Sequence, residues 1–125
     1  MTKIETTNAP GAIGPYSQGM KSGKLVFTSG QIPLDPVTGA IVGDTIEEQS
    51  EQALKNLQAV LEAGGAALGT VVKTTCFLSD MGDFAAFNAV YAKFFTGDCP
   101  ARSCVAVKTL PKGVMVEVEA VAEIE

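Results

Sequence analysis

One arginine in this chain stands where a charged side chain is hard to place. Arg102 comes just after Pro100 and opens a predicted strand of small and apolar residues, 103–107. A guanidinium group there is costly to bury unless it meets an anion. Its planar fork can hold a carboxylate through two parallel hydrogen bonds. The sequence therefore predicts a carboxylate site at Arg102, and a structural ion pair with Glu117 or Glu119 is the alternative.

Two kinds of side chain are candidates to act beside this arginine. Cys104 shares its strand face, but no histidine is present to activate a thiol, so we expect Cys104 to line a pocket. Glu117 and Glu119 share one face of the last predicted strand, and a buried carboxyl group can move protons near neutral pH. Spacing does not choose between the two acids, and a solvated acidic pair is the alternative.

Two segments rich in turn-forming residues supply further polar groups. Tyr16 lies between Pro15 and Gly19, where turn geometry can aim its hydroxyl at a ligand. Ser29 and Gly30 follow a predicted strand, and backbone N–H groups at such a glycine can approach an oxyanion. Both patterns are common in proteins, so each gains weight only together with Arg102.

The composition excludes several classes of site. The chain lacks histidine, which removes Ser-His and Cys-His catalysis and histidine-rich metal sites. Fourteen acidic and nine basic residues give a formal charge of −5, and the lysines are scattered, so a nucleic-acid partner is not expected. Three cysteines without C-x-x-C spacing predict no disulfide framework or zinc site. No apolar run resembles a signal peptide or membrane span, so we expect a cytoplasmic protein.

Two helices and several strands must position these residues. Thr45 and Glu48 form a capping-box pattern ahead of an apolar helical stripe that ends at Gly64. Asp80 or Asp83 is expected to cap a second helix. The inner face of that helix would carry Phe84, Phe87, Tyr91 and Phe94. Strands are predicted at 25–29, 71–78, shortly after Pro100 and at 114–124, with an irregular arm at 8–15 and a loop at 33–43. This order predicts a single domain over 1–125 in which both helices lie on one face of a sheet.

The last predicted strand has two unlike faces. Its even positions between 114 and 124 are all apolar, whereas the odd positions include Glu117, Glu119 and Val121. Two helices can cover only one face of the sheet. We therefore expect the mixed face to pack against copies of itself in a symmetric oligomer. The alternative is an ordinary solvated antiparallel face.

A set of short motifs runs in order along essentially the whole chain. They are Asn8-Ala9-Pro10, Ile13-Gly14-Pro15-Tyr16-Ser17-Gln18-Gly19, Thr28-Ser29-Gly30-Gln31-Ile32-Pro33, Val72-Lys73-Thr74-Thr75, Asp83-Phe84 with Asn88, Tyr91 and Phe94-Phe95, Pro100-Ala101-Arg102-Ser103-Cys104-Val105, and Glu117-Val118-Glu119-Ala120. Together they resemble the RidA family, also called the YjgF family. The resemblance implies a chorismate-mutase-like α+β fold with a mixed sheet, and a homotrimer with three sites between subunits.

The resemblance also implies an activity and roles for particular residues. The activity is hydrolysis of 2-iminopropanoate and 2-iminobutanoate to 2-oxo acids and ammonia, without a cofactor. Arg102 and the Gly30 backbone would hold the substrate carboxylate, and Glu117 rather than Glu119 aligns with the site acid. The other residues implied for the pocket are Tyr16, which would orient the substrate or the leaving ammonia, Ser29, Asn88 and Cys104.

One departure from the family concerns the pocket mouth. The family often has a longer connection, ending in an aromatic residue, before Pro-Ala-Arg-Ser, whereas this chain has only residues 96–99. The shorter loop leaves the preferred size of the substrate open. A 2-oxo-acid sensor that binds without turnover is the main alternative, because it needs Arg102 but no proton shuttle. An RNA-acting role, reported for some members, is opposed by the negative charge.

Overall fold

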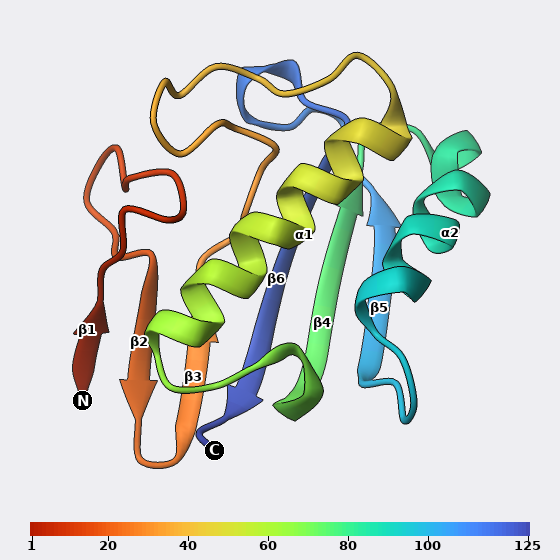
Figure 1. The fold of residues 1–125 in the computed structure, drawn as a ribbon. Coiled ribbons are helices and arrows are strands. Elements are labelled where there is room, and N and C mark those ends of the chain that lie inside the picture. Colours follow the sequence, from red (N-terminus) through yellow and green to blue (C-terminus); the bar gives the residue numbers. More distant parts are fainter.

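The computed structural model describes residues 1–125, in which two helices lie on the same face of one six-stranded sheet (Figure 1). The strands are β1 (Thr2–Ile4), β2 (Gly19–Ser22), β3 (Leu25–Thr28), β4 (Val71–Leu78), β5 (Ala101–Ala106) and β6 (Val116–Glu123). The helices are α1 (Ile46–Ala63) and α2 (Phe84–Phe94), and short 3-10 turns cover Leu68–Thr70, Met81–Asp83 and Pro111–Gly113. The predicted arrangement of helices and sheet is confirmed.

The order of strands across the sheet is β1-β2-β3-β6-β4-β5. Neighbouring strands are antiparallel except β4 and β5, which are parallel. A parallel pair needs a crossover connection, and α2 supplies it between these two strands. The sheet is therefore mixed, as predicted, and β5, which carries Arg102, forms one of its free edges.

Helix α1 follows its sequence signals at both ends. The Thr45 side chain accepts a hydrogen bond from the Glu48 backbone N–H, and the Glu48 carboxylate accepts one from the Thr45 N–H. This capping box satisfies amide groups that have no partner inside the helix. Gly64 forms the C-terminal cap. Between the caps, Leu57 and Leu61 are fully buried in the core against the sheet.

Helix α2 forms where it is expected, and Asp83 occupies its N-cap position, but neither predicted aspartate caps this helix through its side chain. Asp80 caps the preceding 3-10 turn, where its carboxylate accepts a hydrogen bond from the Gly82 N–H. Asp83 stands directly before the helix without any capping bond from its side chain. Phe87 and Tyr91 are buried on the inner face of α2.

The two faces of β6 differ as the alternating pattern predicts. Val116, Val118 and Ala120 point into the core beneath the helices, while Glu117 and Glu119 are half-buried on the other face. The ordered strand begins at residue 116 rather than 114. At the other end of the sheet, β1 carries no alternation that predicts a strand. It exists because it pairs with β2, with Ile4 opposite Gly19.

Candidate active site

The Arg102 side chain lies on the helix-bearing side of the sheet. Its Nη1 donates a 2.8 Å hydrogen bond to the Asn88 side-chain oxygen. The guanidinium carbon lies 4.8 Å from the ring centre of Tyr91 and 5.5 Å from that of Phe84. All three neighbours belong to α2, whose spacing of 84, 88 and 91 places them on one side of the helix. The arginine is thus held by an amide and two aromatic rings.

No acidic side chain pairs with Arg102. The ion pairs of the chain are Lys3–Glu5 and Lys55–Glu51, both at exposed positions. The predicted alternative, an ion pair with Glu117 or Glu119, is therefore wrong. Strand parity explains this result, because both acids leave β6 on the face opposite to the helices. The remaining donors of the guanidinium group have no acceptor within the chain, which is the state expected of an anion-binding arginine.

Cys104 is next to Arg102 on the same strand face, and it lies opposite Cys76 in the parallel register of β4 and β5. Burial raises the pKa of the Cys104 thiol, and the Arg102 charge offsets only part of that effect. Burial likewise raises the pKa of Cys76 to about 12. Both groups are therefore neutral thiols at physiological pH, which favours a lining role for Cys104 over a nucleophilic one.

A second set of the predicted residues lines a hollow of about 370 Å³. Tyr16, Ser29, Gly30 and Glu117 all border it. Its apolar walls come from three residues that were not predicted as site residues, Ile13, Ile32 and Pro111. These side chains belong to separate loops, and no periodicity in the sequence connects them.

Gly30 and Glu117 fit against one another at the base of this hollow. A Cβ atom at position 30 would stand 2.7 Å from the Glu117 side-chain carboxyl carbon, so any other residue at this position would displace the carboxyl group from its present place. The Gly30 backbone N–H donates to no acceptor in the chain, although both neighbours, Ser29 and Gln31, use theirs. The free N–H can donate a hydrogen bond to an acceptor atom of a ligand, while the carboxyl group beside it can exchange a proton with the same ligand.

Burial raises the pKa of the Glu117 carboxyl, and the charge of Glu119 raises it further. The Glu117 carboxyl has no ion pair and accepts no hydrogen bond that would oppose these two effects. A carboxyl group with a raised pKa is better matched to proton transfer near neutral pH than an ordinary one.

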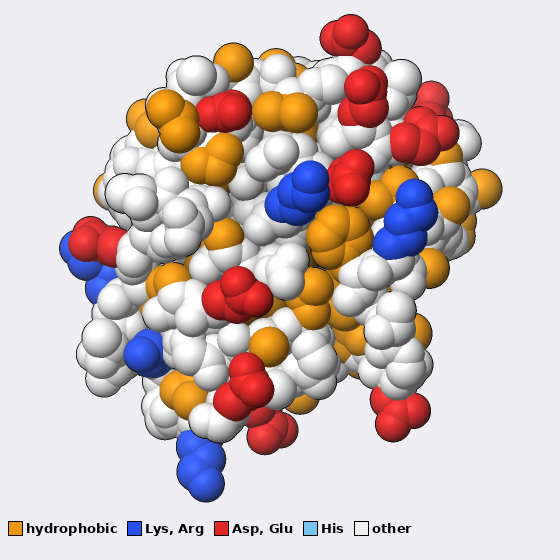
Figure 2. All heavy atoms as spheres, in the orientation of Figure 1, with side chains coloured by type: hydrophobic (Ala, Val, Ile, Leu, Met, Phe, Trp, Pro, Cys, Tyr) orange, Lys and Arg blue, Asp and Glu red, His pale blue; other side chains and the backbone are white.

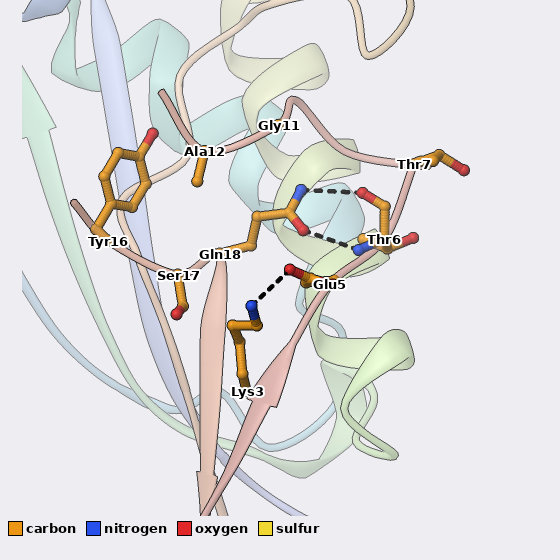
Figure 3. Close-up of a pocket in the computed structure, with 9 residues that line it drawn as sticks. All are labelled: Lys3, Glu5, Thr6, Thr7, Gly11, Ala12, Tyr16, Ser17 and Gln18. Carbon is orange, nitrogen blue, oxygen red and sulfur yellow. Dashed lines mark hydrogen bonds and ion pairs between the residues drawn. The ribbon is translucent and has the colours of Figure 1, made fainter. Parts of the chain in front are cut away.

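The irregular arm that carries Tyr16 is anchored by a buried glutamine. The side-chain amide of Gln18 donates to the backbone oxygens of Thr6 and Pro10, and its oxygen accepts from the Thr6 N–H. Figure 3 shows this anchor beside the exposed Lys3–Glu5 ion pair, with Tyr16 at the far end of the segment. Tyr16, two residues before this anchor, borders the Glu117 hollow.

The predicted site residues therefore form two groups, which one chain does not bring together. The arginine group (Arg102, Asn88 and Cys104) lies on the helix side of β5. The glutamate group (Tyr16, Ser29, Gly30 and Glu117) lies around the hollow at the ends of β3 and β6. Register shows the separation, because Arg102 is level with Thr74 and Ala120 of the core face, and Glu117 leaves the opposite face.

Other features bear on the kind of ligand. No three acidic or cysteine side chains gather as a metal site would require. Figure 2 shows basic side chains placed singly among acidic ones on the helix-bearing face, without a continuous basic stripe. Neither helix has the length and apolar character needed to cross a membrane.

Comparison with known proteins shows the family of the chain. Residues 6–124 match the family model described as endoribonuclease L-PSP. A Salmonella typhimurium protein named 2-iminobutanoate/2-iminopropanoate deaminase is 53% identical over 122 residues, covering 95% of this chain and 94% of that protein. A Lactococcus lactis protein is named as a proposed regulator, AldR. It is 51% identical over 125 residues, covering 100% of this chain and 99% of that protein.

Solved structures agree with the sequence relatives. The crystal structure of Escherichia coli TdcF with bound serine matches this fold with a TM-score of 0.95 at 47% identity, and the match covers 100% of both chains. The family model, the relatives and this structural match all span nearly the entire chain, motifs at both groups of site residues included. The chain belongs to the endoribonuclease L-PSP family, the family of the YjgF and RidA proteins.

Proposed function

We propose that this protein hydrolyses small 2-imino acids, 2-iminopropanoate and 2-iminobutanoate, to 2-oxo acids and ammonia. The observation that carries the proposal is the unpaired guanidinium group of Arg102, which is held in place by Asn88 but bonded to no acid. A 2-imino acid offers the carboxylate that such a group binds. The relative named as a deaminase supports the reaction type at 53% identity.

The site that we propose lies between subunits of a homotrimer with the chorismate-mutase-like arrangement. One chain would supply the arginine group and its neighbour the glutamate group, because the sheet of a single chain separates them. The open face of the sheet supports this assembly, since Phe27 and Val105 leave 42% and 45% of their surface exposed there. Apolar side chains on an uncovered face favour packing against another copy.

The proposed mechanism needs the substrate and a water molecule to be positioned and protons to be transferred. It uses no cofactor and no covalent intermediate with the protein. Arg102 and the Gly30 N–H would fix the carboxylate, which presents the imine carbon to a water molecule in a defined orientation. Glu117 would accept a proton from that water as its oxygen bonds to carbon. This attack opens the carbon–nitrogen double bond and gives a tetrahedral intermediate that carries a hydroxyl group. Protonation of its nitrogen and loss of the hydroxyl proton then form the carbon–oxygen double bond of the 2-oxo acid, while the carbon–nitrogen single bond breaks and ammonia leaves. Tyr16 would orient the leaving nitrogen, while Ser29 and Cys104 line the pocket.

The proposal extends to the setting of the reaction. We propose that residues 1–125 act as one catalytic domain in the cytoplasm. Three free cysteines and the absence of a disulfide in the chain suit a reducing compartment. No membrane or nucleic-acid partner is part of the proposal, because basic residues are few and dispersed.

A competition assay tests the activity. An amino-acid oxidase acting on alanine generates 2-iminopropanoate, and semicarbazide competes with hydrolysis for the imine. We expect the wild type to suppress semicarbazone formation, Arg102→Ala to lose this effect, and Arg102→Lys to lose most of it, since lysine cannot form the two-point contact. Lys93→Ala removes an exposed positive charge from α2 and serves as the matched control. Equal semicarbazone yields with and without wild-type protein would contradict the proposal.

A 2-oxo-acid sensor is the second candidate, and the relative named as a regulator is the observation that favours it. A sensor would use the same arginine but would have no need for the raised pKa of Glu117. Calorimetric binding of pyruvate by a wild-type protein that leaves semicarbazone formation unchanged would select this candidate. Binding combined with suppression selects the hydrolase.

A further inference from the structure

Tyr91 occupies a central place beneath the guanidinium group, yet it belongs to neither group of candidate site residues. Its ring centre lies 4.8 Å from the guanidinium carbon of Arg102. Its hydroxyl makes a buried 2.8 Å hydrogen bond with the hydroxyl of Thr74. The Tyr91 side chain is thus in contact with the arginine through its face and with the sheet through its tip.

The strand register makes this contact specific. Thr74 on β4 is directly opposite Arg102 on β5. The tyrosine hydroxyl is therefore bonded to the side chain of the residue paired with Arg102, and the guanidinium group lies over the tyrosine ring. Thr74 itself is fully buried, so this hydrogen bond is shielded from solvent.

Packing prevents the ring from turning away. The ring of Phe95 stacks on Tyr91 with a centroid distance of 4.5 Å, and Phe87 lies 5.6 Å away in a tilted arrangement. Burial raises the pKa of the Tyr91 hydroxyl, so the group stays neutral and keeps its hydrogen bond at physiological pH. A neutral aromatic ring attracts a guanidinium ion to its face.

Asn88 fixes the rotation of the guanidinium group. It takes the Nη1 hydrogen, which leaves Nε and Nη2 without partners in the chain. Tyr91 sets the height of the guanidinium group above α2, and Asn88 sets its rotation. A free arginine side chain has many rotamers, and fixing one before the ligand arrives removes an entropic cost from binding.

We propose that Tyr91, anchored by Thr74, is a positioning residue that holds the Arg102 guanidinium group ready for the carboxylate of the substrate. This inference rests on the proposed function. Tyr91 touches no reacting atom in this arrangement, so its contribution is to substrate binding. Its loss raises KM and changes kcat less.

Three variants test the inference in the imine assay. Tyr91→Leu removes the ring from beneath Arg102, and we expect KM to rise about tenfold with a smaller change in kcat. Tyr91→Phe keeps the ring but loses the Thr74 bond, and we expect a rise of about two- to threefold. Val90→Ala is the matched control, because Val90 is a side chain of α2 as buried as Tyr91 that lies over neither the guanidinium group nor the Tyr91 ring. We expect this control to lower Tm and leave KM unchanged.

The outcomes separate this inference from the proposed function. If the wild-type protein hydrolyses the imine and both Tyr91 variants have the same KM as the wild type, the positioning role is overturned and the proposed function stands. An equal rise of KM in Val90→Ala and Tyr91→Leu also overturns it, because the effect would then follow core packing. A wild type that hydrolyses no imine overturns the proposed function and this inference with it. Where Tyr91→Leu does not fold, Tyr91→Phe against the wild type decides.

Discussion

Glu117 is an isolated carboxyl group, and this isolation determines how it titrates. Burial and the neighbouring Glu119 charge both raise its pKa, and no ion pair lowers it. The folded chain therefore holds this proton more tightly than the unfolded chain does. The stability that Glu117 contributes is present below its ordinary pKa and is lost as the pH rises through the raised value. A charged Glu117 at neutral pH thus costs stability, as is common for groups kept for chemistry.

A pH profile tests the catalytic role of Glu117. If its carboxylate accepts a proton from water, kcat/KM falls on the acid side as the group protonates. We expect the acid limb of the wild-type profile, measured with the semicarbazide assay, to lie above the ordinary glutamate range. Glu119→Gln removes the charge that raises the pKa, so it shifts this limb to lower pH with little loss of peak activity. Glu117→Gln removes the group that titrates, so we expect it to be inactive on the neutral side of the limb, where the wild type is active; full activity in that variant rules out the role.

At the scale of elements, local signals in the sequence predict local structure well. The capping box at Thr45 and the glycines after residue 63 set the ends of α1, because each satisfies backbone groups within a few residues. Alternation along 114–124 predicts which side chains of β6 are buried. These signals act over distances that a single stretch of sequence contains.

Features that depend on distant partners were not predictable in the same way. Strand β1 forms only because β2 is available to pair with it, and Asp80 caps a 3-10 turn that has no sequence pattern of its own. The walls of the Glu117 hollow come from three loops. For Tyr91, a usable signal was present, since positions 84, 88 and 91 share a helix face with the candidate Asn88.

Helix α1 offers a paired stability prediction. Ser50 is fully buried in α1, and its hydroxyl has no hydrogen-bond partner. Ser50→Ala removes an unsatisfied polar group and improves helix propensity, so the free energy of unfolding should rise by about 1 kcal/mol. Thr45→Ala breaks the capping box and should lower it by about 1 kcal/mol. Urea denaturation at a fixed chain concentration measures the change in the free energy of unfolding for both variants. A Ser50→Ala variant less stable than the wild type would contradict the first expectation.

At the scale of the whole molecule, the sheet stands between the two groups of candidate site residues. Sequence motifs could identify Arg102 and Glu117 as candidates, but they could not show that one chain keeps them apart. That result required the register of β4, β5 and β6. The proposed site therefore depends on assembly, and assembly can be tested without a structure of the oligomer.

Mixing two inactive variants tests whether the site is shared between chains. Arg102→Ala keeps the glutamate group, and Glu117→Gln keeps the arginine group. Unfolding the two together and refolding them at equal amounts should restore about a quarter of wild-type activity, because one in about four random interfaces joins two intact groups. Each variant refolded alone stays inactive and serves as the control. A mixture no more active than its components would show that each site belongs to one chain.

Because the sheet separates Arg102 from Glu117 within one chain, the activity per chain depends on how many copies of the protein are present. Under the proposed function, a newly synthesised chain can fold completely and still have no catalytic capacity until it meets other copies. The rate per chain then depends on expression level wherever copies are scarce, and it reaches a plateau once assembly is complete. Near the concentration needed for assembly, a modest fall in the number of copies would therefore stop the reaction, although every remaining chain is intact.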